Sequence, residues 1–151
     1  MQQATVRSAT KEITYREAVR EALRDAMKRD ERVFLMGEDI GKLGGVFRVT
    51  EGLQAEFGEK RVLDTPLAES AIVGTAIGLA MAGFSTVCEI QFDGFVFPAF
   101  DQITAQLAKM TNRHEGALRM PIVIRIPYGG HIGAVEHHQE SPEAYFAHTP
   151  G

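Results

Sequence analysis

The chain has 151 residues, enough for one domain with a hydrophobic core. Apolar residues make up 44% and charged residues 24%, and the net charge of −4 comes without any run of Lys and Arg, so we expect no nucleic acid and no membrane among its partners. Cys88 is the only cysteine, which excludes an internal disulfide and fits a reducing cytoplasm. We expect a bacterial-type cytoplasmic protein, or a mitochondrial matrix protein if the source is eukaryotic.

The first third of the chain predicts a helix and a buried strand. Residues 1–12 are polar and expected to be loose. Thr14 and Glu17 have capping-box spacing, and apolar residues then recur at helical spacing as far as Met27. The apolar run 33–36 predicts a strand, which ends at 37–39 and leads into a glycine-rich loop.

A short helix over 50–57 and a short strand over 61–64 are expected next, followed by a long helix over 70–82. Gly74 and Gly78 place small residues four apart on one face of that helix. Each glycine costs about 1 kcal/mol against alanine, which is reasonable if another element packs close to the backbone there. Gly83 is a natural end for the helix.

The remaining pattern predicts a strand over 86–91, a helix that starts at Pro98 and continues over 99–110, and a strand over 122–126. This alternation predicts an α/β fold with a mostly parallel sheet flanked by helices. Such sheets bind ligands at the carboxyl ends of their strands. Four strand-end segments are therefore expected at one edge, namely 37–39, 64–69, 91–95 and 127–138.

Two kinds of side chain at these strand ends could carry chemistry. Glu69 is either a carboxylate favoured by the dipole of a helix start or a partly buried group that exchanges a proton with a ligand nitrogen. The histidines of the loop 128–140 have poor spacing for a metal site, because adjacent histidines point apart. One of them could act as a general acid or base, and a solvated loop histidine is the alternative.

Other signals narrow the classes. Four phenylalanines crowd the stretch 92–100; most are expected in the core, but one beside a strand end could stack on a flat heterocycle. The sequence has no GxxxxGK[ST], no GxGxxG after a strand and no GxSxG, which removes several familiar nucleotide-binding and hydrolase classes.

Several separate motifs then stand in a recognisable order. They are Gly37-Glu38-Asp39, 44–53, 64–70, 89–92 with Phe95, 100–103 and 136–138. Together they resemble the β subunits of thiamine-diphosphate-dependent 2-oxoacid dehydrogenases, over about Ile13 to Gly151. The resemblance implies that 13–151 is a pyrimidine-binding domain with the thiamine-diphosphate-binding fold. The family's carboxy-terminal transketolase-type domain is absent, and we expect the natural chain to be longer.

The resemblance also implies roles for individual residues. Glu69 matches the glutamate that contacts N1′ of the cofactor aminopyrimidine and exchanges a proton with it. Leu67, Gln91 and Phe95 match further cofactor contacts. His138, rather than His137, matches the histidine implied in acyl transfer to a lipoyl group. Glu38 is expected in a chain of acidic groups that links two active sites.

The chain departs from the family pattern after the histidine, where Gln139 replaces the usual serine. The Gly-Asp-Gly…Asn-Asn motif for diphosphate and Mg²⁺ is absent and is carried by the α subunit in the family. The resemblance therefore implies an α2β2 heterotetramer, Mg²⁺ held by the α subunit and a lipoyl-bearing dihydrolipoyl acyltransferase core as partner. No metal ligand is expected among the side chains, and a potassium ion bound through the backbone of Ile122 is left open.

The function implied is oxidative decarboxylation of a 2-oxoacid with acyl transfer to lipoyl, by a subunit inactive without its α partner. The stretches 91–100 and 141–144 favour a branched-chain substrate, with pyruvate next. A transketolase-like pyrimidine half is the alternative within the same cofactor class. A non-catalytic assembly fragment, in which the Glu69 carboxylate only caps a helix, is the alternative from another class.

Overall fold

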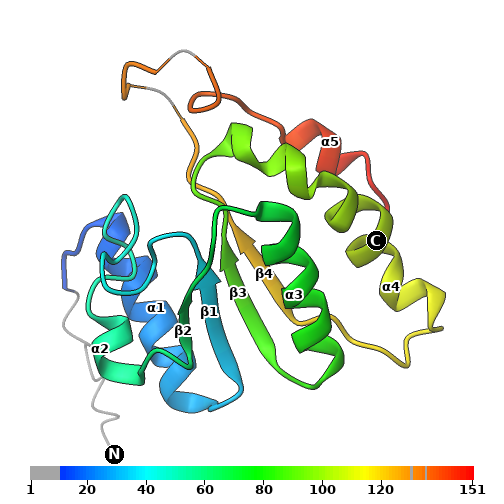
Figure 1. Cartoon of the computed structure of the whole chain (residues 1–151), viewed down its shortest axis with the longest axis horizontal. Helices are drawn as coiled ribbons and strands as arrows, with labels where there is room; N and C mark the ends of the chain where they lie inside the picture. Colours follow the sequence, from blue (N-terminus) through cyan, green and yellow to red (C-terminus); the bar gives the residue numbers. More distant parts are fainter. Residues whose placement is uncertain (1–10, 130, 135) are drawn as a thin grey trace, which may run out of the picture.

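Four parallel strands form the centre of the molecule, in the order β2-β1-β3-β4 (Figure 1). The computed structural model describes residues 11–129, 131–134 and 136–151. The predicted loose segment 1–12 lies almost wholly outside these residues. The sheet confirms the predicted α/β class, and every predicted strand is present within two residues of its expected bounds: β1 Val33–Gly37, β2 Val62–Asp64, β3 Ser85–Glu89 and β4 Ile122–Arg125.

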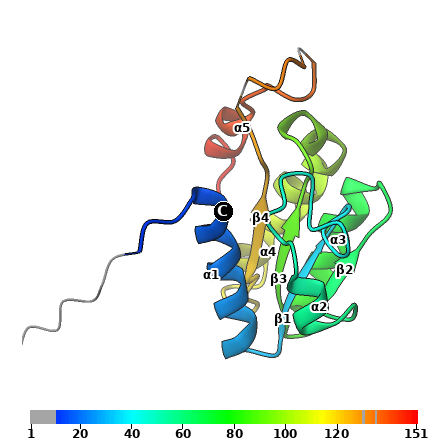
Figure 2. The same cartoon turned by 90° about the vertical axis from the view of Figure 1, so that its left-hand side faces the viewer.

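Helices cover both faces of the sheet. Successive side chains of a strand point to opposite faces, so one strand packs against helices on both sides. Leu35 of β1 packs in a cluster with Leu23 and Met27 of α1, which spans Tyr15–Arg29. The next residue, Met36, packs instead with residues of α3, Glu69–Met81. Figure 2 shows α1 on one side of the sheet and α3 on the other. The short α2, Leu53–Phe57, adds Leu53 to the α1 cluster.

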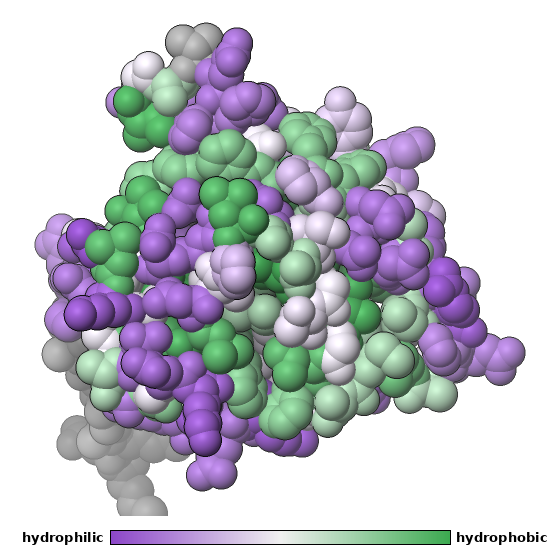
Figure 3. Space-filling view, in the orientation of Figure 1, coloured by the Kyte–Doolittle hydropathy of each residue, from purple (hydrophilic) through white to green (hydrophobic). Residues whose placement is uncertain are grey.

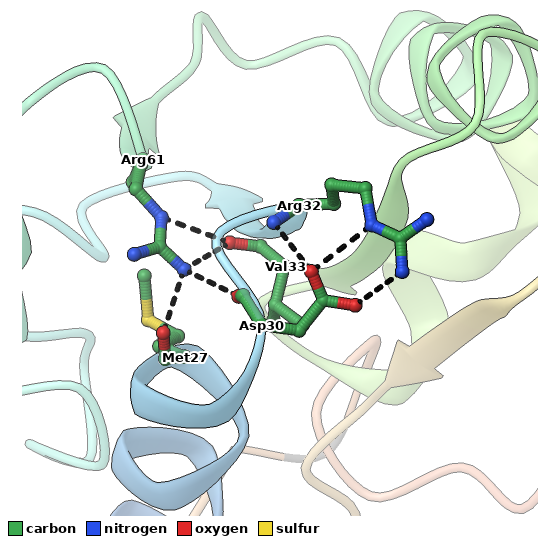
Figure 4. A network of polar contacts seen from close by, with 5 residues as sticks. All are labelled: Met27, Asp30, Arg32, Val33 and Arg61. Carbon is green, nitrogen blue, oxygen red and sulfur yellow. Dashed lines mark hydrogen bonds and ion pairs between the residues drawn. The ribbon is translucent and has the colours of Figure 1, made fainter.

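The ends of α1 are both fixed by side chains. The predicted capping box is confirmed, since the Thr14 hydroxyl accepts from the Glu17 N–H while the Glu17 carboxylate accepts from the Thr14 N–H at 2.8 Å. At the other end, the Arg61 guanidinium donates to the carbonyls of Met27, Asp30 and Val33 at 2.9–3.3 Å (Figure 4). Arg61 thereby ties the end of α1 and the start of β1 to β2.

The small residues of α3 lie on an open face. A Cβ at Gly78 would meet nothing within 4 Å, and one at Gly74 would come no closer than 3.7 Å, to the Gln102 side chain. The close packing expected at these glycines is therefore not made by the described residues. In Figure 3 the surface over α3 is pale, the colour of residues near the middle of the hydropathy scale. Gly83 ends α3 with a φ of +90°, as predicted.

The segment after β3 differs from the predicted helix. Helical structure begins at Asp93 rather than at Pro98, as a 3₁₀ turn over Asp93–Ala99 that contains the proline. It continues through a π-helical stretch, Gln102–Leu107, into α4, Ala108–Arg113. The early start has a tertiary cause, because Asp93 and Val96 are buried and the turn packs against α3. A five-residue helix near the end, α5 Glu143–Ala147, was not predicted.

Among the described residues, no helix has both the length and the apolar character that crossing a membrane would need.

Candidate functional site

The last residues of all four strands stand in one row. Gly37 is paired in register with Asp64 on one side and Glu89 on the other, and Glu89 is paired with Arg125. The segments that leave these strands therefore start from a common edge, at the top of the sheet in Figure 1. This confirms the prediction that the four strand-end segments share one edge.

Two buried carboxylates meet at this edge. Glu69, the first residue of α3, is 6% exposed, and Glu38, just after β1, is 8% exposed. Burial raises the pKa of the Glu38 carboxyl, and the negative charges of Glu69 and Asp39 raise it further. The Oε1 atom of Glu38 has no hydrogen-bond partner within the part of the chain that the structure describes. Buried polar atoms are nearly always paired, so this oxygen is available to a group from outside the chain.

The other predicted cofactor contacts lie around these carboxylates with different exposures. Leu67 is 79% exposed on the segment that leads into α3. Gln91 follows β3 and is half-buried, and its amide donates to the Asp39 carboxylate at 3.4 Å across the edge. Asp39 itself has a φ of +57°, in the left-handed region that non-glycine residues rarely adopt.

His138 sits against aromatic rings from the turn after β3. Its ring lies 4.4 Å from the Phe92 ring and 5.1 Å from the Phe95 ring, measured between centroids. Phe92 also contacts Phe47, at 5.6 Å. The Nδ1 atom of His138 lies 2.7 Å from the Glu136 carbonyl oxygen, which can only accept. This contact assigns the proton of the neutral ring to Nδ1 and leaves Nε2 free to exchange a proton.

The glycine-rich loop, residues 40–52, is tied down over the same edge. The Thr50 hydroxyl donates to the Ile40 carbonyl at 2.6 Å, and the Gly41 N–H donates to the Asp64 carboxylate at 2.6 Å. A Cβ at Gly41 would collide with the ends of the Asp64 and Gln54 side chains, so the hydrogen bond from Gly41 to Asp64 could not keep this geometry with a larger residue. The loop thereby carries Phe47 to Phe92 beside His138.

A buried ion pair lies beneath this loop and was missed from the sequence. Glu89, 5% exposed, pairs with Arg125 on the neighbouring strand end. Burial raises the pKa of the Glu89 carboxyl, while the Arg125 guanidinium opposes that shift. A Cβ at Gly45 would come within 3.5 Å of a Glu89 oxygen. Opposite charges at the ends of two predicted strands could have indicated the pair.

Of the other histidines in this part of the chain, His137 is exposed with a φ of +64°, and its ring stacks on the Phe95 ring at 6.1 Å between centroids. His131 is exposed with a φ of +77°. His148 follows α5 and lines a separate surface hollow with Phe100 and Lys109. Within residues 11–129, 131–134 and 136–151, no three His, Cys, Asp or Glu side chains come together as metal ligands would.

Comparison with known proteins matches residues 11–151 to the family described as transketolase, pyrimidine binding domain. This chain belongs to that family. As a pyrimidine-binding domain it is 72% identical, over 134 residues, to "Pyruvate dehydrogenase E1 component subunit beta" of Leifsonia xyli, a match that covers 89% of this chain and 40% of the relative.

Two further relatives carry names of the branched-chain type. The domain is 56% identical over 146 residues to "3-methyl-2-oxobutanoate dehydrogenase subunit beta" of Mycobacterium tuberculosis, covering 97% of this chain and 42% of that one. It is 48% identical over 139 residues to "2-oxoisovalerate dehydrogenase subunit beta" of Bacillus subtilis, covering 92% and 42%. The pyrimidine-binding domain thus spans about two fifths of the length of the curated relatives it matches.

Proposed function

We propose that this chain is the pyrimidine-binding part of the β subunit of a 2-oxoacid dehydrogenase, which decarboxylates a 2-oxoacid with thiamine diphosphate. One observation carries the proposal: Glu69 is a buried carboxylate, fixed at the first residue of α3, on the same sheet edge as Gln91, Phe95 and His138. A core has no need of a buried acid there. The names of the similar β subunits support the same activity.

The residues at the edge fit the aminopyrimidine end of thiamine diphosphate. A flat heterocycle with ring nitrogens needs a carboxylate partner and an apolar surface for its ring. Glu69 offers the first and Phe95 the second, with Leu67 and Gln91 as further contacts. The buried Glu38 oxygen that lacks a partner among the described residues adds a polar atom that a ligand could satisfy. When bound, the cofactor supplies the carbon nucleophile and the electron sink for decarboxylation.

The role proposed for Glu69 is to hold and exchange one proton at N1′ of the aminopyrimidine. Its attachment to the start of a helix fixes the position of the carboxylate, and its burial keeps water from competing for the proton. The negative charge of Glu69 raises the pKa of the neighbouring Glu38 carboxyl, which couples the two acids. Glu38 is accordingly proposed to belong to a chain of acidic groups that links two active sites.

The role proposed for His138 is to donate a proton when the acyl group moves to a lipoyl sulfur. The Glu136 carbonyl holds Nδ1, which leaves Nε2 as the exchanging atom. The Phe92 and Phe95 rings limit the positions that the imidazole can take. The family usually has a serine after this histidine, where this chain has Gln139, and these rings are the contacts proposed to orient the imidazole here.

The proposal includes partners that complete the site. An α subunit would hold the diphosphate and Mg²⁺ in an α2β2 heterotetramer, and a lipoyl-bearing acyltransferase core would accept the acyl group. The open, small-residue face of α3 supports a close approach by another chain. A potassium ion at the Ile122 backbone would be structural, because Ile122 begins β4 and lies at the opposite end of that strand from the site edge. The proposed location is the cytoplasm.

The proposed substrate is a 2-oxoacid with a branched aliphatic side chain, with pyruvate next. The stretches 91–100 and 141–144 resemble the branched-chain members of the family, and two of the similar relatives carry names of the branched-chain type. The test is steady-state turnover of 3-methyl-2-oxobutanoate against pyruvate by the complete α-with-β enzyme. A higher kcat/KM for the branched acid supports the proposal. Turnover of neither acid would contradict the proposed activity itself.

A further inference from the structure

Gly94 lies where the loop that carries His138 meets the rest of the molecule. The Gly94 N–H donates to the His137 carbonyl at 3.1 Å. A Cβ built on Gly94 would lie 2.6 Å from the His137 carbonyl oxygen, 2.8 Å from its carbonyl carbon, and would also collide with its Cα. Gly94 does not have a positive φ, so its backbone conformation is open to any residue. The close approach of the loop is therefore what requires glycine here.

The contact at Gly94 is made by backbone, one residue before the candidate histidine. His137 takes a φ of +64°, and the next side chain, His138, then falls between Phe92 and Phe95. These two phenylalanines flank Gly94 in the sequence, so one short turn, residues 92–95, holds both the loop backbone and the imidazole. In Figure 1 the loop after β4 rises over the start of this helical run.

The two sides of this contact differ in how firmly they are held. Asp93 is 1% exposed and Val96 fully buried, and the turn packs against α3. The Asp93 carboxylate also accepts from the Gly94 N–H, at 2.9 Å, which fixes the turn from within. His137, in contrast, is exposed. An added methyl group at Gly94 would therefore displace the loop and leave the turn in place.

We propose that Gly94 is a positioning residue for His138: its missing side chain lets the His137 backbone seat on the turn 92–95 and so fixes the imidazole at the acyl-transfer site. This inference rests on the proposed function, because it assigns His138 the transfer to lipoyl. Gly94 itself touches neither substrate nor cofactor in this scheme. Its effect passes entirely through the position of His138.

The experiment uses the complete enzyme with its α subunit and compares Gly94→Ala with wild type in two assays. Decarboxylation is followed with an artificial electron acceptor, and acyl transfer with a lipoyl domain. A displacement of about 1 Å in a catalytic group can cost about a hundredfold in rate, so transfer is expected to fall at least about tenfold. Decarboxylation should keep at least about a third of its rate, since Glu69 does not depend on the loop.

A double variant separates positioning from general damage. If Gly94 acts through His138, Gly94→Ala combined with His138→Ala should transfer no more slowly than His138→Ala alone. Gly83→Asn is the control for adding a side chain at a glycine. Gly83 follows α3 at the end away from the site, its φ of +90° lies in the left-handed region that asparagine can occupy after a helix, and nothing lies within 4 Å of an added Cβ. It should leave both assays unchanged.

Three results would overturn the inference. They are an equal loss in both assays, a double variant clearly worse than His138→Ala, and a Gly94→Ala protein that fails to fold, since the clash should be relieved by the exposed loop. Failure of the proposed function would look different, because wild type itself would then release no carbon dioxide from a 2-oxoacid.

Discussion

Single residues at the sheet edge carry charge in places where burial makes charge costly. Glu38 is the clearest case, since its carboxylate is 8% exposed and one of its oxygens has no partner among the described residues. The negative charges of its neighbours Glu69 and Asp39 repel the charge of Glu38 and do not compensate it. A buried charge of this kind lowers the free energy of unfolding of the isolated chain, so we expect its role to lie in binding a ligand or a partner.

Glu38→Gln should raise the free energy of unfolding at pH 7. Burial raises the folded-state pKa of Glu38 above its ordinary value of 4.5, so below that value the carboxyl is neutral in both states and costs nothing. As the pH rises through the folded-state pKa, the native protein must ionise a buried group and stability is lost. Denaturant unfolding at several pH values checks this, with exposed Glu59→Gln as control. A gain that does not shrink toward pH 4.5 would contradict it.

Arg61 should matter more to stability than Arg32, although both lie at the same corner (Figure 4). Arg61 is half-buried and donates to three carbonyls, so Arg61→Met should lower the free energy of unfolding by about 2 kcal/mol as those acceptors lose their donor. Arg32 pairs with Asp30 at an exposed site, and Arg32→Met should change little. Denaturant unfolding of both variants is the measurement. Similar losses in the two would count against this account.

Elements with a strong hydrophobic pattern were predictable from the sequence, and elements held by tertiary contacts were not. The capping box of α1, the end of α3 at Gly83 and all four strands follow from local signals. The 3₁₀ turn that begins at Asp93 is buried against α3, and its Gly94 N–H meets the His137 carbonyl 43 positions further along the chain; no local pattern contains either contact. The five-residue α5 is likewise set by ring contacts of Tyr145 and Phe146 with Phe100.

The candidate site was likewise predictable from the sequence only in part. The alternation of strands and helices was enough to bring the four strand ends to one edge, and the family motifs named Glu69 and His138. The support around them was not predicted. Phe92 beside His138, the Glu89–Arg125 pair and the seat at Gly94 arise only when segments distant in sequence pack together.

A substitution in the loop after β4 should affect decarboxylation and acyl transfer to different extents. His138→Ala is expected to slow transfer to a lipoyl domain more than decarboxylation measured with an artificial acceptor, because only the transfer needs a proton from the imidazole. His137→Ala is the matched control, since it removes the neighbouring imidazole, which is exposed and stacks on Phe95, while His138 lies on Phe92. Equal losses in both assays, or a more damaging change at His137, would show that the wrong histidine has been assigned.

At the scale of the whole molecule, the proposed site is half of a cofactor site. One edge of the sheet gathers the residues proposed to contact the aminopyrimidine, while the sequence lacks the Gly-Asp-Gly…Asn-Asn motif expected to bind diphosphate and Mg²⁺. The chain also spans about two fifths of the length of its curated relatives. The proposed function therefore requires a second polypeptide.

This chain alone should bind thiamine diphosphate weakly. The diphosphate carries most of the ligand's charge, and its binding motif is not in this sequence. Isothermal titration calorimetry with Mg²⁺ present should give a Kd well above about 1 mM, which leaves little measurable heat. Addition of the α subunit should bring the Kd into the micromolar range. Micromolar binding by this chain without a partner would be incompatible with the half-site account.

The most direct test of the account is carbon dioxide release from a 2-oxoacid by the assembled enzyme, comparing wild type with Glu69→Gln. Glutamine keeps the shape and the helix start but cannot exchange the proton, so release should fall at least about a hundredfold, the usual contribution of a positioned acid or base. Thermal unfolding of the two proteins should nearly coincide. Turnover by Glu69→Gln at the wild-type rate would contradict the account.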